Sequence, residues 1–183
     1  PVGRQEIIVV DNTRKTATAI NPATGLPYFF VFVDNTSNSD GTYESPYHSL
    51  AQAQNNSSPS DIIYVFPGNG TTAGMNSGIV LQANQKFWGS GVSHSIQTSA
   101  GTISIPAQSS ASPTITNTNV DTELNAITLA TNNAISGFII SNPGNDAIYG
   151  ANAQNLEVSF CTIDHATTYA IEASFSGAAS ISI

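Results

Sequence analysis

Three series of apolar positions recur along the chain with a period near 23 residues, and they constrain the fold more than any other feature. They are Ile127, Ile148 and Ile171; Ile135, Val158 and Ile181; and Ile140 with Ile163. Each period contains short alternating stretches separated by Asn, Gly and Ser corners. Such a period predicts a solenoid in which each repeat forms one coil, and equivalent residues of neighbouring coils stack about 4.8 Å apart.

The predicted fold is therefore all-β, a right-handed parallel β-helix (solenoid) whose interior is filled by columns of Ile and Val. Asn84, Asn132 and Asn155 fall at matching phases, which predicts a ladder of side-chain amides at one corner. A leucine-rich solenoid is the nearest alternative, but the chain lacks the leucine frame of that fold.

The upstream part of the repeat is less regular. Residues 79–81 precede Ile127 by 48 residues, which we interpret as about two periods. Residues 101–106 and 113–116 would then occupy the intervening coil.

Residues 1–60 are predicted to cap the first coil, and residues 61–183 to form coils of about 23 residues within one structural domain. The cap contains strands near residues 6–11 and 28–33 and a short α-helix over residues 45–54. Ser45 is the expected N-cap and Pro46 the first helical residue, where a missing N–H costs nothing.

The C-terminal end carries no turn or capping signal after its alternating residues 181–183. We expect the native chain to be longer and to continue into further coils or meet a partner. A bare end of this kind also predicts end-to-end self-association, because open strand edges pair readily.

Composition narrows the classes of partner. Lys and Arg total 4 against 12 Asp and Glu, so the net charge is −8. So few cations exclude a nucleic-acid backbone and an anionic membrane surface as partners. A hydrophobic content of 40% indicates an ordered domain. The single cysteine, Cys161, excludes an intrachain disulfide and a cysteine-based zinc cluster.

Two sets of motifs resemble known families. Residues 40–53 (DGTYESPYHSLAQA), followed by residues 61–65 (DIIYV), are similar to the start of many right-handed β-helix proteins, where such a helix caps the first coil. Residues 1–9 (PVGRQEIIV), 21–25 (NPATG) and 78–85 (GIVLQANQ) resemble large surface proteins of chlamydia-like bacteria.

Those surface proteins carry an outer-membrane barrel of the inverse-autotransporter (intimin/invasin-like) type and export β-helical passenger segments. The resemblance covers most of residues 1–106. It implies a passenger at the bacterial outer membrane and cell surface. It also implies that a β-barrel anchors the parent chain while this segment itself is not embedded in the membrane.

Right-handed β-helices include polysaccharide lyases and hydrolases, so enzymatic chemistry has to be weighed. A lyase needs a Lys or Arg base, and no Lys or Arg follows Lys86. A hydrolase needs clustered carboxylates. The acidic residues of the coils fall at different phases of the repeat; they are Asp121, Glu123, Asp146, Glu157, Asp164 and Glu172. Glu157 aligns with Ala134 and Ser180, and Asp164 with Ser141.

Asp164 and His165 form the most suggestive pair, but no Ser or Cys nucleophile is assigned to them by spacing. A solvated corner, with His165 above Asn142, is the favoured reading. His48 is expected on the cap helix and His94 in a loop, without the spacing of metal ligands.

Three further features of the sequence are candidates for a functional role. Cys161 aligns with Phe138 and is predicted to be a packed hydrophobe rather than a reactive thiol. Phe87 and Trp88 are predicted to belong to the core or cap rather than to a sugar-stacking surface. The loop 34–41 (DNTSNSDG) has oxygen ligands near calcium spacing but lacks the terminal Glu of an EF-hand, so calcium binding there stays open.

The sequence predicts no catalytic, cofactor-binding or metal-binding residues. The first hypothesis is a non-catalytic, surface-exposed passenger or stalk of a bacterial outer-membrane protein, active in adhesion or host contact. Its partner would be a host or cell-surface receptor or a glycan that the sequence does not identify. The alternative is a carbohydrate-binding or polysaccharide-cleaving β-helix protein.

Overall fold

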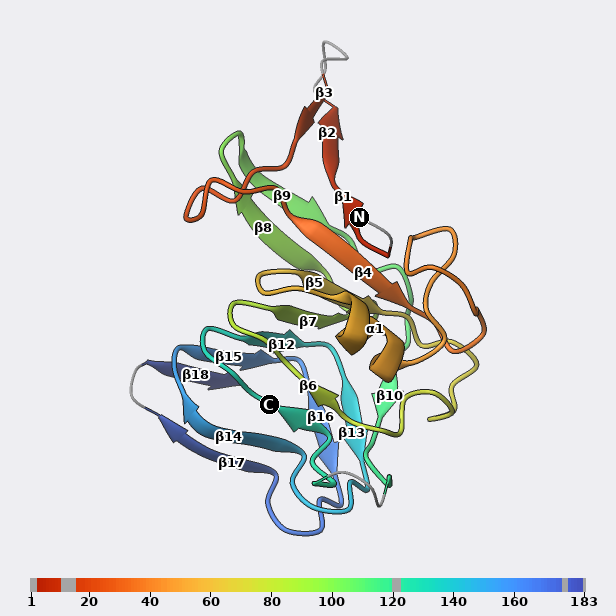
Figure 1. Ribbon diagram of the computed structural model, residues 1–183. Helices are drawn as coiled ribbons and strands as arrows, with labels where there is room; N and C mark the ends of the chain where they lie inside the picture. Colours follow the sequence, from red (N-terminus) through yellow and green to blue (C-terminus); the bar gives the residue numbers. More distant parts are fainter. Residues whose placement is uncertain (1–2, 11–15, 120–122, 176–177, 183) are drawn as a thin grey trace.

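Parallel strands dominate the computed structural model, which describes residues 3–10, 16–119, 123–175 and 178–182 (Figure 1). In this part of the chain a seven-stranded sheet contains, in spatial order, β1 (Gln5–Glu6), β4 (Phe29–Val33), β5 (Ile62–Val65), β7 (Lys86–Gly89), β12 (Ala134–Ser136), β15 (Leu156–Ser159) and β18 (Ala179–Ser182). All neighbours in it are parallel except β1 and β4, which are antiparallel.

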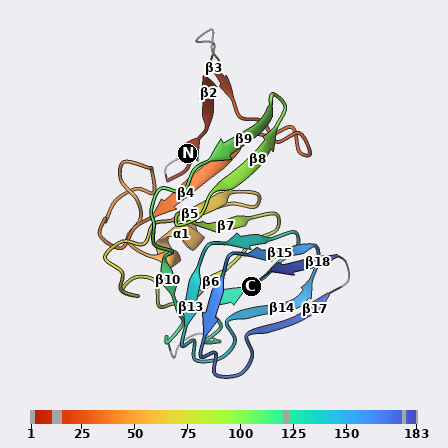
Figure 2. The same cartoon turned by 180° about the vertical axis from the view of Figure 1, so that it is seen from behind.

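Two smaller parallel sheets accompany it among the described residues. One contains β6 (Ile79–Val80), β11 (Ile127–Thr128), β14 (Ile148–Ala153) and β17 (Ile171–Phe175). The other contains β10 (Thr114–Ile115), β13 (Ile139–Ser141) and β16 (Thr162–Asp164). From β10 onward the chain passes through the three sheets in turn, so that each pass lies beside the one before it (Figure 2).

The register of these sheets confirms the alignment predicted from the 23-residue period. The directly paired apolar residues are Ile127 with Ile148, Ile148 with Ile171, Ile135 with Val158, Val158 with Ile181, and Ile140 with Ile163. The predicted partners of the acidic residues are also correct, since Glu157 pairs with Ala134 and Ser180, and Asp164 with Ser141.

The interpretation of the 48-residue interval is wrong. Phe87 of β7 pairs directly with Ile135 of β12, so the interval is one pass and not two. The extra length includes an antiparallel hairpin of β8 (His94–Thr98) and β9 (Gly101–Ile105). Residues 101–105 therefore lie in this hairpin rather than in a coil, whereas β10 does join the parallel sheets. Alternating apolar residues are common to both kinds of strand, so the pattern alone could not separate them.

The predicted helix start is also wrong. The helix α1 (Leu50–Asn56) begins after Ser49, whose hydroxyl accepts a hydrogen bond from the backbone of Gln52 in a reciprocal capping box. Before the helix, Tyr47 forms a β-bridge with Val33 of β4 instead of a helical turn: its N–H donates to the Phe32 carbonyl at 2.9 Å. Tertiary pairing therefore overrides the local Ser-Pro helix signal.

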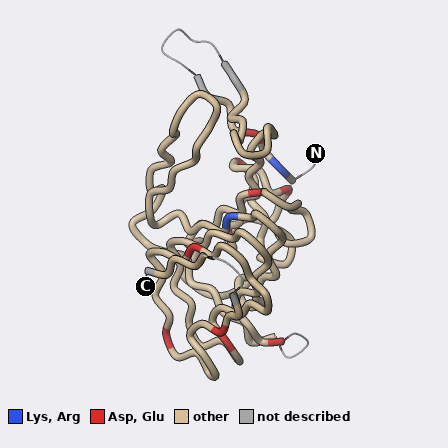
Figure 3. Tube along the Cα trace, turned by 90° about the vertical axis from the view of Figure 1, so that its left-hand side faces the viewer, with Lys and Arg blue, Asp and Glu red and all other residues tan. Residues whose placement is uncertain are grey.

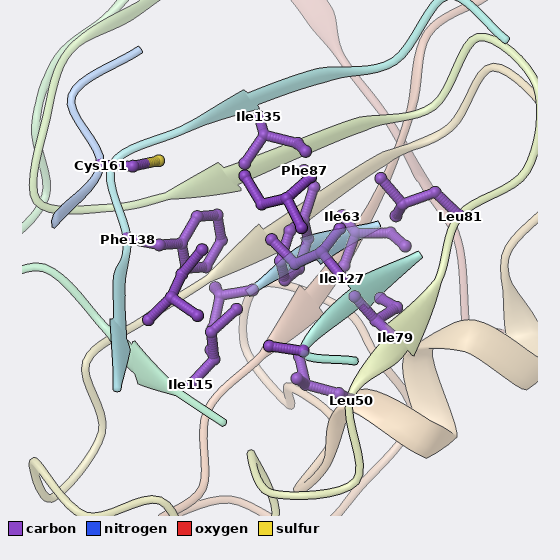
Figure 4. Close-up of a cluster of buried hydrophobic side chains, with 14 of the residues drawn as sticks. Leu50, Ile63, Ile79, Leu81, Phe87, Ile115, Ile127, Ile135, Phe138 and Cys161 are labelled. Atoms are coloured by element: carbon purple, nitrogen blue, oxygen red, sulfur yellow. The ribbon is translucent and has the colours of Figure 1, made fainter. Parts of the chain in front are cut away.

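A single apolar cluster lies between the three parallel sheets (Figure 4). Phe87 is fully buried there and stacks on Phe138 with ring centroids 4.2 Å apart. Leu50 of α1 packs into the same cluster, so the helix covers the N-terminal end of the core. Cys161 also belongs to it, which confirms the predicted packing role, and burial raises the pKa of its thiol.

The predicted amide ladder is present at one corner, where successive passes of the chain turn. Asn132 donates to the amide oxygen of Asn84 at 2.8 Å, and Asn155 donates to that of Asn132 at 2.7 Å. All three residues have positive φ values, which are 63°, 58° and 50° in chain order. Asn tolerates this left-handed conformation better than most residues, so the same side chain both permits the corner and links successive passes of the chain.

An ion pair that sequence analysis missed ties the N-terminal segment to the first parallel strands. The guanidinium of Arg4 donates to both carboxylate oxygens of Asp61, with Nε 2.6 Å from Oδ2. Asp61 is buried, and the guanidinium also lies over the ring of Phe29 at 4.3 Å from its centroid.

The described residues contain no helix long and apolar enough to cross a membrane.

Candidate functional site

The outer face of the seven-stranded sheet changes character from one end to the other. Alternate residues of a strand point to opposite faces, so one outward row crosses neighbouring strands in register. It contains Phe32, Tyr64, Trp88, Ser136 and Ser159. The adjacent outward row contains Phe30, Ile62, Lys86, Ala134 and Glu157. Bulky aromatic residues near β4 thus give way to small and charged residues at β15.

The hairpin β8–β9 covers the middle of this face. Ile96 of the hairpin packs in a second apolar cluster with Tyr64 and Trp88. The ring of His94 stacks on Trp88, with centroids 4.5 Å apart and an angle of 6° between the planes. Both views of the ribbon place β8 and β9 beside β4, on the side away from β14 and β17 (Figures 1 and 2). The inserted hairpin has a hollow on either side of it, and each has its own chemistry.

The first hollow, which we name the aromatic pocket, has a volume of about 310 Å³. Its lining residues are Gln5, Glu6, Ile7, Phe30, Phe32, Tyr43, Tyr64, Ile105 and Gln108. The ring of Tyr43 meets that of Phe32 edge-on, at 5.4 Å and 86°, and half of Tyr43 is exposed. Tyr64 also meets Phe32 edge-on, at 5.8 Å and 66°. The rings of Tyr43 and Tyr64 therefore both meet the ring of Phe32 edge-on.

The hydroxyl of Tyr64 is the unusual group of this pocket. The side chain is 2% exposed, and the hydroxyl has no hydrogen-bond partner among the described residues. Burial raises the pKa of Tyr64 to about 12, so the group stays a neutral phenol at physiological pH. A buried polar atom without a partner costs free energy and points to a ligand or water that satisfies it.

The second hollow, which we name the polar groove, has a volume of about 250 Å³. Lys86, Trp88, His94 and Glu157 line it, together with several serines and the exposed Phe160. The Lys86 ammonium lies 5.4 Å from the centroid of the Trp88 ring. Burial lowers the pKa of Lys86, and the negative charge of Glu157 works against this shift.

His94 is held as a neutral ring in this groove. Burial lowers its pKa, the carbonyl of Gly89 opposes the shift, and the charge of Lys86 adds to it. Nε2 of His94 lies 2.8 Å from the Gly89 carbonyl, to which it donates. The prediction that His94 lies in a loop is wrong, because it begins β8 and is buried. The alternation of His94, Ile96 and Thr98 was the available signal for this strand.

A comparison with known protein families assigns the chain to one of them. Residues 33–179 match the family described as protein of unknown function (DUF1565). The chain belongs to this family. No curated protein matches it, and no solved structure does.

The Asp164–His165 pair of this DUF1565 member lies at a solvated corner, as predicted. Nδ1 of His165 contacts Oδ1 of Asp164, and the two side chains are 77% and 49% exposed. The hydroxyl of Ser141 lies 3.5 Å from Oδ2 of Asp164, so it contacts the carboxylate and not the imidazole of His165. A hydroxyl nucleophile requires the histidine between itself and the acid, so this order does not activate Ser141.

The described acidic residues of the later passes are dispersed over the DUF1565 chain. Glu157 lies on β15, Asp164 on β16 and Glu172 on β17, which belong to three different sheets. Asp146 is buried, and its Oδ1 accepts a hydrogen bond from the backbone of Tyr169. Asp121 lies outside the described residues. Figure 3 shows the same dispersal of charge along the trace.

The carboxylates of loop 34–41 are engaged in local turns. Oδ1 of Asp34 accepts from the backbone N–H of Thr36 at 2.8 Å, and Oδ1 of Asp40 accepts from that of Thr42 at 3.2 Å. Between them, Nδ1 of His48 lies 2.9 Å from the Ser37 carbonyl. The prediction that His48 lies on the helix is wrong, because α1 begins at Leu50. Within the ranges described, no three His, Cys, Asp or Glu gather into a metal site.

Phe87 and Trp88 both belong to the core, as predicted, but on opposite sides of the sheet. Phe87 points into the cluster between the sheets, whereas Trp88 packs in the outer cluster beneath the hairpin. The sequence analysis did not find the aromatic pocket. Its side chains come from distant segments that the hairpin and the antiparallel strand β1 bring together, and no sequence spacing encodes that meeting.

Proposed function

We propose that the chain is a segment of right-handed parallel β-helix in a non-catalytic passenger or stalk of a bacterial outer-membrane protein. In this proposal it makes contact with a host or cell-surface partner through the outer face of its seven-stranded sheet. Support comes from the in-register parallel pairing of successive passes and from membership of a family found in β-helix-type surface proteins.

The single observation that carries the contact role is the departure of the outer face from the repeat. The interior is regular, but the outer face bears an inserted hairpin flanked by the aromatic pocket and the polar groove. Large apolar side chains are exposed beside both, with Tyr43 50% and Phe160 69% exposed. Exposed apolar groups next to a formed hollow favour a binding surface over a plain spacer.

The dispersal of the acidic side chains supports the non-catalytic part of the proposal. Glycoside hydrolysis uses two carboxyl groups that flank one bond. Here Glu157, Asp164 and Glu172 stand on three different sheets.

Fractionation of the source cells with an antibody to this segment tests the surface location. A band far above the 19.0 kDa of this chain in the outer-membrane fraction is the expected result. A soluble species of about that mass would overturn the anchored passenger.

Binding of the purified chain to host cells tests the contact face, with Tyr43→Ala as the variant. Tyr169→Ala is the matched control, since Tyr169 is 56% exposed and does not line the aromatic pocket.

A carbohydrate-binding or polysaccharide-cleaving protein is the second candidate, and the polar groove favours it. Lys86, His94 and Glu157 bring a cation, a neutral imidazole and a carboxylate to one hollow that Trp88 borders. Incubation with a glycan panel and detection of new reducing ends separates binding from cleavage. Product release that disappears in Glu157→Gln would overturn the non-catalytic proposal.

End-to-end association is a further element of the proposal. Among the described strands, β16, β17 and β18 each stand at one end of their sheets, so in the isolated segment their outer edges offer backbone groups for pairing. Light scattering at increasing concentration tests this, and a size that rises with concentration is expected. A constant monomer mass would remove self-association from the proposed role.

A further inference from the structure

We propose that the aromatic pocket binds one ring of an uncharged glycan, with the Tyr64 hydroxyl as its buried hydrogen-bonding group. This names the ligand class for the contact face of the proposed function and rests on that function for its biological setting. The binding itself is a property of the isolated chain, so it can be tested separately.

The walls of the pocket suit the carbon face of a sugar. Phe32 and Tyr43 meet at 86°, so their rings form an angled surface rather than a flat patch. Tyr43 is half exposed at the mouth, whereas Phe30 and Tyr64 are buried deeper in the pocket. Aromatic rings supply a large contact area with little conformational freedom to lose. A pyranose ring presents C–H groups to such a surface and hydroxyls at its edge.

The buried hydroxyl distinguishes a sugar from an apolar ligand. Tyr64 is 2% exposed, lines the pocket and has no partner for its hydroxyl among the residues described. A neutral phenol both donates and accepts a hydrogen bond, as a sugar hydroxyl does. The hydroxyl is already shielded from water in the free chain; an aliphatic side chain of a peptide would leave it without a partner, whereas a sugar hydroxyl would supply one.

The polar residues of the lining complement a neutral sugar. Oε1 of Gln5 accepts from the backbone of Tyr43 at 2.9 Å, which fixes this side chain and leaves its amide N–H groups as donors. Nε2 of Gln108 donates to the Pro106 carbonyl at 3.1 Å, which leaves its amide oxygen as an acceptor. Glu6 adds a carboxylate to the lining, and the chain carries a net charge of −8. Both charges repel an anionic ligand, so an uncharged glycan is favoured.

The test is saturation-transfer NMR and titration of the purified chain with methyl glycosides of glucose, galactose, mannose and N-acetylglucosamine. Methyl glucuronide is the anionic arm. We expect at least one neutral glycoside to bind more tightly than the glucuronide. Tyr64→Phe, which removes only the hydroxyl, is expected to weaken that binding by roughly five- to tenfold. Tyr28→Phe is the matched control, because the Tyr28 hydroxyl donates to the Gln97 carbonyl and does not line the pocket.

Three results would overturn the proposal. They are the absence of binding across the neutral panel, preference for the glucuronide, and equal binding by wild type and Tyr64→Phe. Tyr43→Ala is a second variant that keeps the test independent of Tyr64, and it too is expected to weaken binding, whereas Tyr169→Ala is not. Sugar binding by a chain that fractionates as a soluble protein would sustain this inference and overturn the surface role. Surface display without sugar binding would do the reverse.

Discussion

The two faces of the seven-stranded sheet obey different rules although the same strands build both. The inner row contains Val31, Ile63, Phe87, Ile135 and Val158, all apolar and no more than 1% exposed. The outer row in register runs from Phe32 and Tyr64 through Trp88 to Ser136 and Ser159. The inner row varies little in chemistry, whereas the outer row changes from aromatic side chains on β4, β5 and β7 to serines on β12 and β15.

The difference has a physical cause. Each inner residue stacks on its equivalents in the neighbouring passes, so a polar or misshapen side chain there opens a cavity or buries an unpaired group. An outer residue faces solvent or the inserted hairpin, so its side chain does not have to match its equivalents in the neighbouring passes. The interior therefore sets the fold, and the outer face is free to carry a binding surface.

The largest expected effect comes from breaking the inner face. Ile148 is fully buried and pairs with both Ile127 and Ile171, so Ile148→Ala removes the middle of a column. We expect the free energy of unfolding to fall by about 2–5 kcal/mol in urea titrations. Thr128→Ala, at a half-buried position of the adjacent strand, is the control and should cost little. Equal losses in the two variants would mean that the assigned inward and outward phases are wrong.

The second prediction concerns the corner that carries the amide ladder. Asn132 is the middle amide and has a φ of 58°. Asn132→Gly keeps the left-handed backbone but loses the ladder, which should cost about 1 kcal/mol. Asn132→Ala loses both and should cost about 1–2 kcal/mol more. Identical stabilities of the two variants in urea would show that the backbone conformation adds nothing at this corner.

The same contrast explains what the sequence could predict. The inner columns and the Asn84–Asn132–Asn155 ladder were predictable because each repeat must place like residues at like positions. The helix start was not, since the pairing of Tyr47 with β4 is a tertiary contact that the local Ser-Pro signal does not encode. The Ser49–Gln52 capping box was a local signal that could have corrected it.

The outer face was largely hidden from sequence analysis. An insertion breaks the period, and the alternating pattern of β8 and β9 is indistinguishable from that of two coil strands. Once the hairpin folds back, residues as distant as Glu6 and Ile105 line one pocket. The buried site of His94 follows from the same fold-back. The period and the composition report the features that successive passes have in common, so they do not reveal a site that an inserted hairpin builds.

Acidification tests the outer face without changing its shape. The pKa of His94 lies below its ordinary value of about 6.5 because of burial, with Lys86 adding to the shift and the Gly89 carbonyl opposing it. The unfolded chain therefore binds a proton first, and the free energy of unfolding should fall as the pH drops below about 6.5. Urea titrations across pH should show a shallower fall in His94→Gln than in wild type. Parallel curves for wild type and His94→Gln would contradict the assignment.

The smallest expected effect concerns two hydroxyls in the outer cluster. Tyr28 and Tyr64 are both buried there, at 5% and 2% exposure, but only the Tyr28 hydroxyl has a partner, the Gln97 carbonyl at 2.9 Å. Tyr28→Phe should lower the free energy of unfolding by about 1 kcal/mol, because the carbonyl loses its donor. Tyr64→Phe should leave it unchanged within about 0.5 kcal/mol or raise it, because no bond is lost.

Measured in the same urea titrations, this pair separates stability from function on one surface. A residue kept for packing should lose stability when its polar atom is removed. A hydroxyl kept for a ligand should lose binding instead, as proposed for Tyr64. A cost for Tyr64→Phe equal to that of Tyr28→Phe would mean that the Tyr64 hydroxyl is satisfied within the folded chain. The Tyr64 hydroxyl would then stabilise the folded chain, as the side chains of the inner face do. The contrast between the two faces would not include this residue.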